Sequence, residues 1–189
     1  MISSRIVSFF LVFLTLGFLT YAKPVIGANV EKRQAADSIE TVIANLQASA
    51  NTILPQIDSL VDSGEASDDN VAPLLQELQQ AFETANTDMT AFTLKGGDGK
   101  SHKKDELAKV IAGIVITVTK TLDKLLLTGA KLPVVGGILV TLKVTINKLL
   151  LAVELLLAGV LKLVAVLLVD VAVLLKSIGF GLILATLGL

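Results

Sequence analysis

The sequence contains no cysteine. Disulfide frameworks are the usual device by which small secreted proteins compensate for a small core, and here that device is excluded. The sequence also has no Asn-x-Ser/Thr sequon, so N-linked glycans are excluded as a means of keeping the chain soluble. Stability must therefore come from the burial of apolar side chains, from assembly, or from both.

Aromatic residues are scarce as well. The chain has no tryptophan, and its one tyrosine, Tyr21, lies in the N-terminal segment. After residue 33 the only aromatic side chains are Phe82, Phe92 and Phe180. Stacking on sugars or bases requires aromatic platforms, so binding of that kind is not expected.

Residues for catalysis or metal binding are missing too. The single histidine, His102, lies in a highly charged stretch with no apolar pocket around it, whereas nucleophilic catalysis needs a base held against a nucleophile. An acidic turn contains four carboxylates but lacks the spacing of a calcium-binding loop, and we interpret it as a solvated turn; they are Asp62, Glu65, Asp68 and Asp69. We therefore expect no enzyme activity, cofactor or metal ion.

The first 22 residues have the pattern of a secretory signal peptide. Arg5 supplies the basic start, residues 6–19 are apolar, and Ala22 stands where a signal peptidase cleaves. Ala28 is the second choice for cleavage. The alternative, an uncleaved N-terminal anchor, is less favoured because the apolar run is short for a membrane span.

A dibasic pair, Lys32-Arg33, follows the expected signal peptide. Such a pair is typical of a pro-peptide processing site, although a solvated pair of charges is the alternative. The sequence thus predicts a pro-segment over residues 23–33 and a mature chain that begins at Gln34.

The remaining chain is strongly asymmetric in charge. Residues 34–94 contain ten acidic residues and neither lysine nor arginine, whereas residues 107–189 contain eight lysines and three acidic residues. Nucleic acid is not an expected partner, because the lysines are dispersed along an apolar segment that has no arginine. Residues 95–106 separate the two parts, and their glycines and charges predict a linker.

The acidic part predicts two amphipathic helices. Apolar residues recur every three or four positions over residues 34–63 and again from residue 71 to residue 92. Asp37 or Ser38 is expected to open the first helix, Pro55 to kink or split it, and Gly64 to end it. We expect the two helices to form an antiparallel hairpin with its carboxylates facing water.

The second part is far more apolar than a soluble helical bundle requires. Of its 83 residues 54 are apolar, including 24 leucines and 14 valines, whereas a bundle helix needs about three apolar residues in seven. We predict helices over 105–127 and 138–177, with breaks at 128–129 and 133–137, an interruption of the second near Gly159, and an apolar tail. Strand competes over 110–119, where β-branched residues concentrate. The expected fold class is all-α, an acidic helical hairpin followed by a Leu/Val-rich multi-helix region.

A polar stripe along the second long helix is also expected. At 100° per residue, five side chains project within about 100° of one another, which would leave the rest of the surface apolar; they are Lys143, Asn147, Glu154, Lys162 and Lys176. The excess apolar surface has three possible partners: a membrane, other copies of the chain, or an apolar interface or wall polymer. Lysines divide the apolar runs into lengths too short for a span, which disfavours the first.

The layout resembles that of small, secreted, cysteine-free wall proteins of mushroom-forming fungi. The resemblance rests on the signal peptide, the hydrophilic segment SIETVIANLQASANTILPQIDSLVDSG, the absence of cysteine, and the segments LLLAVELLLAGVLKLVAVLLVDVAVLL and GLILATLGL. It implies a structural role in the cell wall or extracellular matrix, in aerial hyphae and attachment, without catalytic residues. The acidic part alone is similar, more loosely, to fungal hydrophobic-surface-binding proteins.

We therefore expect a protein secreted to the cell wall or extracellular matrix that acts by amphiphilic adsorption or self-assembly. Wall polymers, apolar surfaces and other copies are the expected partners. Two alternatives stay open: a membrane protein anchored or associated through helices of residues 107–189, and a helical lipid carrier with a cavity lined by the same residues.

Overall fold

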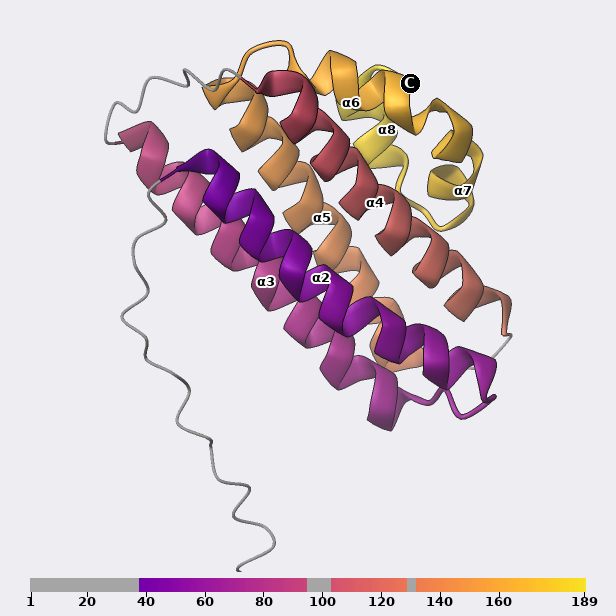
Figure 1. The fold of residues 1–189 in the computed structure, drawn as a ribbon. Coiled ribbons are helices and arrows are strands. Elements are labelled where there is room, and N and C mark those ends of the chain that lie inside the picture. The colour runs from indigo at the N-terminus through magenta and orange to yellow at the C-terminus, as the bar shows by residue number, and fades with distance from the viewer. Residues whose placement is uncertain (1–37, 95–102, 129–131) are drawn as a thin grey trace, which may run out of the picture. The chain divides into compact units, whose positions relative to one another are not determined.

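The computed structural model describes residues 38–94, 103–128 and 132–189, and all regular structure in these ranges is helical (Figure 1). The expected all-α fold class is therefore confirmed. The helices are α2 (Ile39–Asp62), α3 (Asp68–Leu94), α4 (Lys104–Leu127), α5 (Pro133–Leu156), α6 (Val160–Leu168), the 3₁₀ turn η1 (Val169–Val171), α7 (Ala172–Ser177) and α8 (Gly181–Leu187).

The ends of α2 follow from local chemistry. Ser38 has extended backbone angles, and its hydroxyl accepts a hydrogen bond from the Thr41 amide at 3.2 Å, which satisfies one of the free donors of the first turn. Gly64 ends the helix with φ +72°, a conformation that costs glycine little. Both end signals are confirmed. Pro55 lies inside α2, and the helix continues through it. Of the two expected effects of this proline, a kink or a split, the split is therefore wrong.

The acidic helices share their core with the apolar part of the chain. α2 packs against α3 and α4, α3 packs against α5, and α4 and α5 both pack against the short C-terminal helices. In Figure 1, α2 and α3 lie on one side of α4 and α5, while α6, α7 and α8 lie on the other. Buried apolar residues of all these elements form one cluster. The expected boundaries at residues 94 and 106 stay predictions, although α4 already begins at Lys104.

The centre of the core is almost completely filled. A void of about 10 Å³ remains, with room for at most about one water molecule. Its lining comes from four helices, α2, α3, α4 and α5, and consists of Ile43, Leu46, Phe82, Ile111, Ile114, Val115, Ile146, Leu149 and Leu150.

The helical stretch predicted over 138–177 ends at Ser177 as expected and is interrupted near Gly159 as expected, but its predicted start is wrong. α5 begins at Pro133, where a break was expected, because proline at the first helical position loses no hydrogen bond and already has a helical φ. The helix then ends at Leu156. Gly159, with φ +92°, turns the chain into α6, and this turn is the predicted interruption. η1 and α7 follow α6 and complete the segment.

The predicted polar stripe is wrong because of the turn at Gly159. A stripe needs a single straight helix, and the chain changes direction at residues 157–159. Lys143, Asn147 and Glu154 remain together on α5, whereas Lys162 and Lys176 belong to α6 and α7.

Candidate functional surface

The excess apolar residues of the sequence are found on the surface. Among the described residues, fifteen large apolar side chains are exposed, and α2 and α3 contribute only Leu94. The other fourteen follow residue 107, so the exposed apolar surface belongs almost entirely to one part of the chain. They are Leu126, Leu127, Val134, Val140, Val144, Leu151, Leu155, Leu163, Val166, Leu167, Val169, Val173, Leu182 and Leu189.

Four of these side chains form a stripe along α5, named here the α5 stripe: Val140, Val144, Leu151 and Leu155. At 100° per residue they project within about 60° of one another, opposite to the face that carries the fully buried Val153. Leu155 is 72 % exposed. Surface apolar residues are usually scattered singly, so an ordered stripe of this kind is a candidate contact surface.

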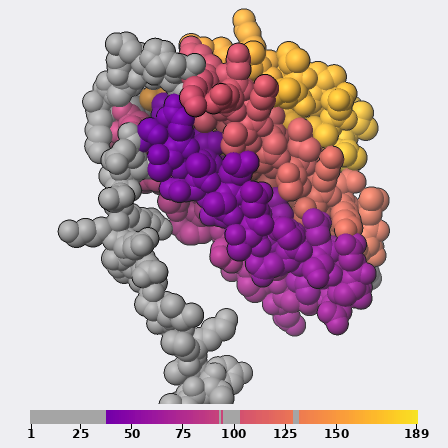
Figure 2. All heavy atoms as spheres, in the orientation of Figure 1, coloured from indigo at the N-terminus to yellow at the C-terminus, as the bar shows by residue number. Residues whose placement is uncertain are grey.

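A second apolar surface is formed by α6, η1 and α7, and is named here the α6–α7 face. Val166 and Val173 are 74 % and 78 % exposed, and the charged side chains of this segment, Lys162, Asp170 and Lys176, are exposed with them. The remaining apolar members are Leu163, Leu167 and Val169. Figure 2 shows α6 and its neighbours on the side of the surface away from α2, with α4 between them.

Two polar side chains of α5, Glu154 and Asn147, form hydrogen bonds with the C-terminal helices. The two carboxylate oxygens of Glu154 accept hydrogen bonds from the amides of Gly159 and Leu161, each at 2.9 Å. Asn147 is buried and accepts a hydrogen bond from the Thr186 hydroxyl. Glu154 and Asn147 thus connect α5 to the C-terminal helices, and the α5 stripe faces solvent.

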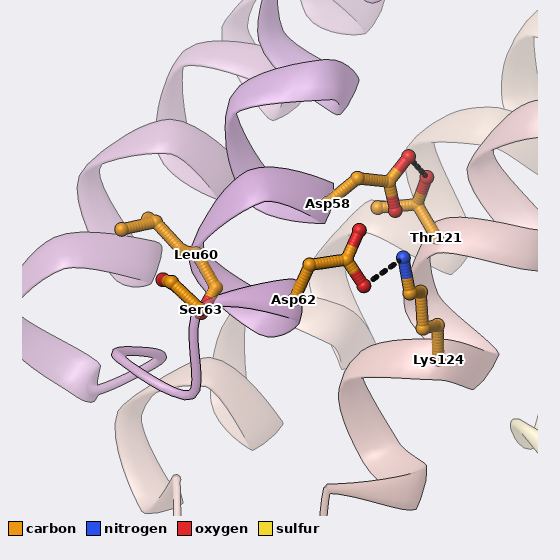
Figure 3. A network of polar contacts seen from close by, with 6 residues as sticks. All are labelled: Asp58, Leu60, Asp62, Ser63, Thr121 and Lys124. Atoms are coloured by element: carbon orange, nitrogen blue, oxygen red, sulfur yellow. Dashed lines mark hydrogen bonds and ion pairs between the residues drawn. The ribbon is translucent and has the colours of Figure 1, made fainter.

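The acidic helix α2 is connected to α4 by a polar seam (Figure 3). Thr121 donates a hydrogen bond to the Asp58 carboxylate at 3.2 Å, and the Lys124 ammonium lies 2.6 Å from Asp62. The hydrogen bond to Asp62, with the negative charges of Asp62 and Asp58, raises the pKa of Lys124 above its usual value. The seam fixes α2 against α4 and joins the acidic part to the cationic part.

The carboxylates of the acidic turn take structural roles. Asp62 pairs with Lys124, and Glu65 accepts a hydrogen bond from the Ser63 hydroxyl at 3.3 Å. Asp68 accepts hydrogen bonds from the backbone amides of Val134 and Val135 at the start of α5. No group of three ligating side chains suited to a metal ion occurs among the described residues.

Several residues singled out from the sequence lie outside the described ranges. These are the expected processing residues Ala22, Lys32 and Arg33, together with His102. The processing sites therefore stay predictions. The two apolar surfaces, by contrast, were not predicted residue by residue. Apolar residues recur at 140, 144, 151 and 155 in the sequence, and this helical spacing is the signal from which the α5 stripe could have been predicted.

Within the described ranges, α5 alone is long and apolar enough to cross a membrane, judged by length and composition. In the structure, 44 % of its most apolar stretch is buried against the rest of the protein. Core helices of soluble proteins have the same properties, so this finding by itself is weak evidence for a span.

Comparison with known proteins gives one informative match. The chain is 38 % identical over 79 residues to fruiting body differentiation protein 16 of Flammulina velutipes. The match covers 41 % of this chain and 61 % of that protein, which is less than two thirds of its length. No protein-family model matches the chain. The match supports the resemblance to proteins of mushroom-forming fungi at this coarse level.

Proposed function

We propose that this chain is a secreted structural protein of a fungal cell wall or extracellular matrix, and that it acts by adsorbing to apolar surfaces or by self-assembly. The observation that carries the proposal is the uneven exposure of large apolar side chains along the chain: among the described residues, fourteen of the fifteen exposed ones lie after residue 107. Exposed apolar side chains of this kind contribute little to folding, and a protein would be more soluble if they were buried or replaced by polar residues.

The hydrophobic effect alone supplies enough free energy for adsorption or assembly, without any specific chemical interaction. Removing roughly 500 Å² of apolar surface from water gains on the order of 12 kcal/mol at about 25 cal/mol per Å². The α5 stripe and the α6–α7 face are the surfaces that we assign to this contact. The acidic helices α2 and α3 would then remain in water and keep the adsorbed protein hydrated.

The biological setting of the proposal comes from the comparison. The relative from Flammulina velutipes is named for fruiting body differentiation. An amphiphilic protein that coats hyphae or attaches them to one another would serve in a fruiting body. This role is proposed for the present chain by analogy.

Fractionation of the producing organism tests the location. The proposal predicts the protein in the culture medium and in detergent extracts of the wall, with an N-terminus at Gln34 after cleavage at Lys32-Arg33. Recovery only in membranes that have been washed with alkali would contradict it. Detection should use antibody or mass spectrometry, because the predicted mature chain has neither tryptophan nor tyrosine.

Adsorption to an uncharged fluoropolymer film, followed with a quartz crystal microbalance, tests the mechanism. Val166→Gln with Val173→Gln should lower the adsorbed mass at equal protein concentration, since both side chains lie on the α6–α7 face. Glu77→Gln on α3 is the matched control and should leave adsorption unchanged. Equal adsorption by all three proteins would exclude this face from the contact.

A membrane protein is the second candidate, and α5 is the observation that favours it. In that case α5 would have to leave its contacts with α3 and α8, and Lys143, Lys148 and Glu154 would enter the bilayer at a cost. For a lipid carrier the described structure offers no comparable support, since the central void of about 10 Å³ does not hold a hydrocarbon chain.

A further inference from the structure

We propose that the α6–α7 face docks on an anionic lipid surface, with its valine and leucine side chains at the level of the headgroups and its lysines beside the lipid phosphates. The inference rests on the proposed function, because the same face makes the apolar contact, and it adds the chemical class of the surface that this face prefers. Charge complementarity is the argument for that class.

The exposed charges of the apolar part are almost all positive. After residue 107, the exposed charged side chains in the described ranges are Lys109, Lys120, Lys148, Lys162, Asp170 and Lys176. None of these five lysines is paired with a carboxylate within the described structure. The two other carboxylates of this part are engaged internally, Asp123 with the Ser177 hydroxyl and Glu154 with the start of α6.

The negative charges are held on other elements. α2 and α3 carry acidic residues and no lysine or arginine, and they make their main contacts with each other, α4 and α5, whereas α6 contacts α4, α5 and α8. In Figure 1 the two groups of helices lie on opposite sides of α4 and α5. A protein that docks by the α6–α7 face therefore directs the carboxylates of α2 and α3 away from an anionic surface, which lowers their repulsion and leaves Asp170 as the acidic residue on the face itself.

The α6–α7 face combines the two features of interfacial helices. Val166 and Val173 are its most exposed apolar side chains, and Lys162 and Lys176 are exposed on the same segment. The long stem of lysine lets its ammonium group reach the phosphate level while apolar neighbours enter the headgroup region. Basic residues beside an anionic bilayer strengthen binding in a salt-dependent way.

A second copy of the chain fits this face less well. A two-fold contact through this face would bring the lysines of both copies together, with one Asp170 in each copy to offset them. An anionic lipid surface instead places negative charge opposite these lysines.

Binding to vesicles tests the inference, with the full chain as recovered from its host. Partitioning onto vesicles of 70 % phosphatidylcholine and 30 % phosphatidylglycerol should exceed partitioning onto pure phosphatidylcholine at least tenfold, and it should fall when the salt concentration is raised. The double variant Lys162→Gln, Lys176→Gln should weaken binding to the anionic vesicles by about ten- to thirty-fold, and Asp170→Asn should strengthen it about fivefold.

The control variant removes the same charge elsewhere. Lys109→Gln with Lys120→Gln, both on α4, should weaken binding by less than about threefold. An equal loss from both double variants would show that net charge alone acts and would overturn the assignment to this face. Equal binding to neutral and anionic vesicles would overturn the preference for anionic lipid.

The two proposals fail separately. Adsorption of the unmodified chain to the uncharged fluoropolymer film tests the proposed function without any lipid charge. A chain that adsorbs to the film but does not distinguish the two vesicle types retains the proposed function and loses the lipid inference. A chain that binds anionic vesicles at low salt concentration but never adsorbs to the film contradicts the proposed function.

Discussion

The Asp68 carboxylate accepts a hydrogen bond from the backbone amide of Val135 at 3.1 Å, across 67 positions of the sequence. Asp68 begins the second acidic helix, and Val135 lies in the first turn of α5, the most apolar long helix. The start of α5 has no hydrogen-bonding side chain of its own, because Leu132 stands at its N-cap position. The acidic part therefore supplies the cap that the apolar part lacks.

Removal of this carboxylate should destabilise α5. We expect Asp68→Ala to lower the free energy of unfolding by about 1 kcal/mol more than Asp69→Ala does. Both residues lie in the first turn of α3, so the loss of a favourable charge at that helix end is common to the two variants. Chemical denaturation followed by circular dichroism measures the difference. Equal values for the two variants would show that the contact with α5 contributes nothing.

The carboxylate of Glu154 plays the corresponding part for α6. Glu154→Ala leaves the amides of Gly159 and Leu161 without their acceptors and should cost about 1–2 kcal/mol of stability. Glu154→Gln keeps one acceptor oxygen and should fall between the wild type and the alanine variant. The exposed Glu77→Ala on α3 is the control, with an expected change within about 0.5 kcal/mol. Faster hydrogen exchange at the Gly159 and Leu161 amides in Glu154→Ala would locate the effect, and unchanged exchange would contradict it.

Much of the fold follows from sequence patterns because local and tertiary preferences agree there. α2 has an apolar period of 3.6 residues, a serine cap and a terminal glycine, and the structure has it between Ser38 and Gly64 as expected. α4 also begins and ends within one residue of its predicted bounds. The C-terminal segment is different, since nearly every position is apolar and no period identifies the buried face.

The interruption near Gly159 follows from the glycine in the sequence, whereas the start of α5 at Pro133 and the 3₁₀ turn η1 between α6 and α7 were not predicted. Leucine-rich sequence favours a continuous helix, but the turn at Gly159 allows Leu157, Val160 and Val164 to become buried. The same turn makes Glu154 a cap instead of part of a solvent-facing stripe. The excess of apolar residues was predictable from composition. The position of the exposed apolar side chains on α5 and on α6–α7 could not be predicted from composition. Only the packing of the helices determines which apolar residues remain exposed.

The ion pair between Asp62 and Lys124 predicts a specific pH dependence. The pKa of Lys124 is raised in the folded protein, chiefly by its hydrogen bond to Asp62 and further by the charges of Asp62 and Asp58. A raised pKa means that folding favours the protonated lysine. The contribution is complete below the unfolded value near 10.5 and is lost as the pH rises through the higher folded value.

A titration of the Lys124 side chain by NMR, carried out at alkaline pH, measures this directly. Asp62→Asn should return the pKa of Lys124 toward 10.5, because the charged acceptor is gone. Asp69→Asn, which removes a carboxylate that takes no part in this ion pair, should leave the titration of Lys124 unchanged. A titration that is the same in all three proteins would show that the ion pair of Figure 3 is not formed in solution.

Substitution by alanine at two different glycines should change the stability of the protein in opposite directions. Gly159 has φ +92°, where a β-carbon is strained even though no atom lies within 4 Å of its position, and Gly159→Ala should cost about 1–2 kcal/mol. Gly136 lies in the first turn of α5, also with free space around it, and Gly136→Ala should stabilise the protein by about 0.5–1 kcal/mol. Urea unfolding of both variants measures the two changes. If Gly159→Ala is also stabilising, residues 157–159 are helical in solution, and α5 and α6 form the continuous helix that their leucine-rich sequence favours.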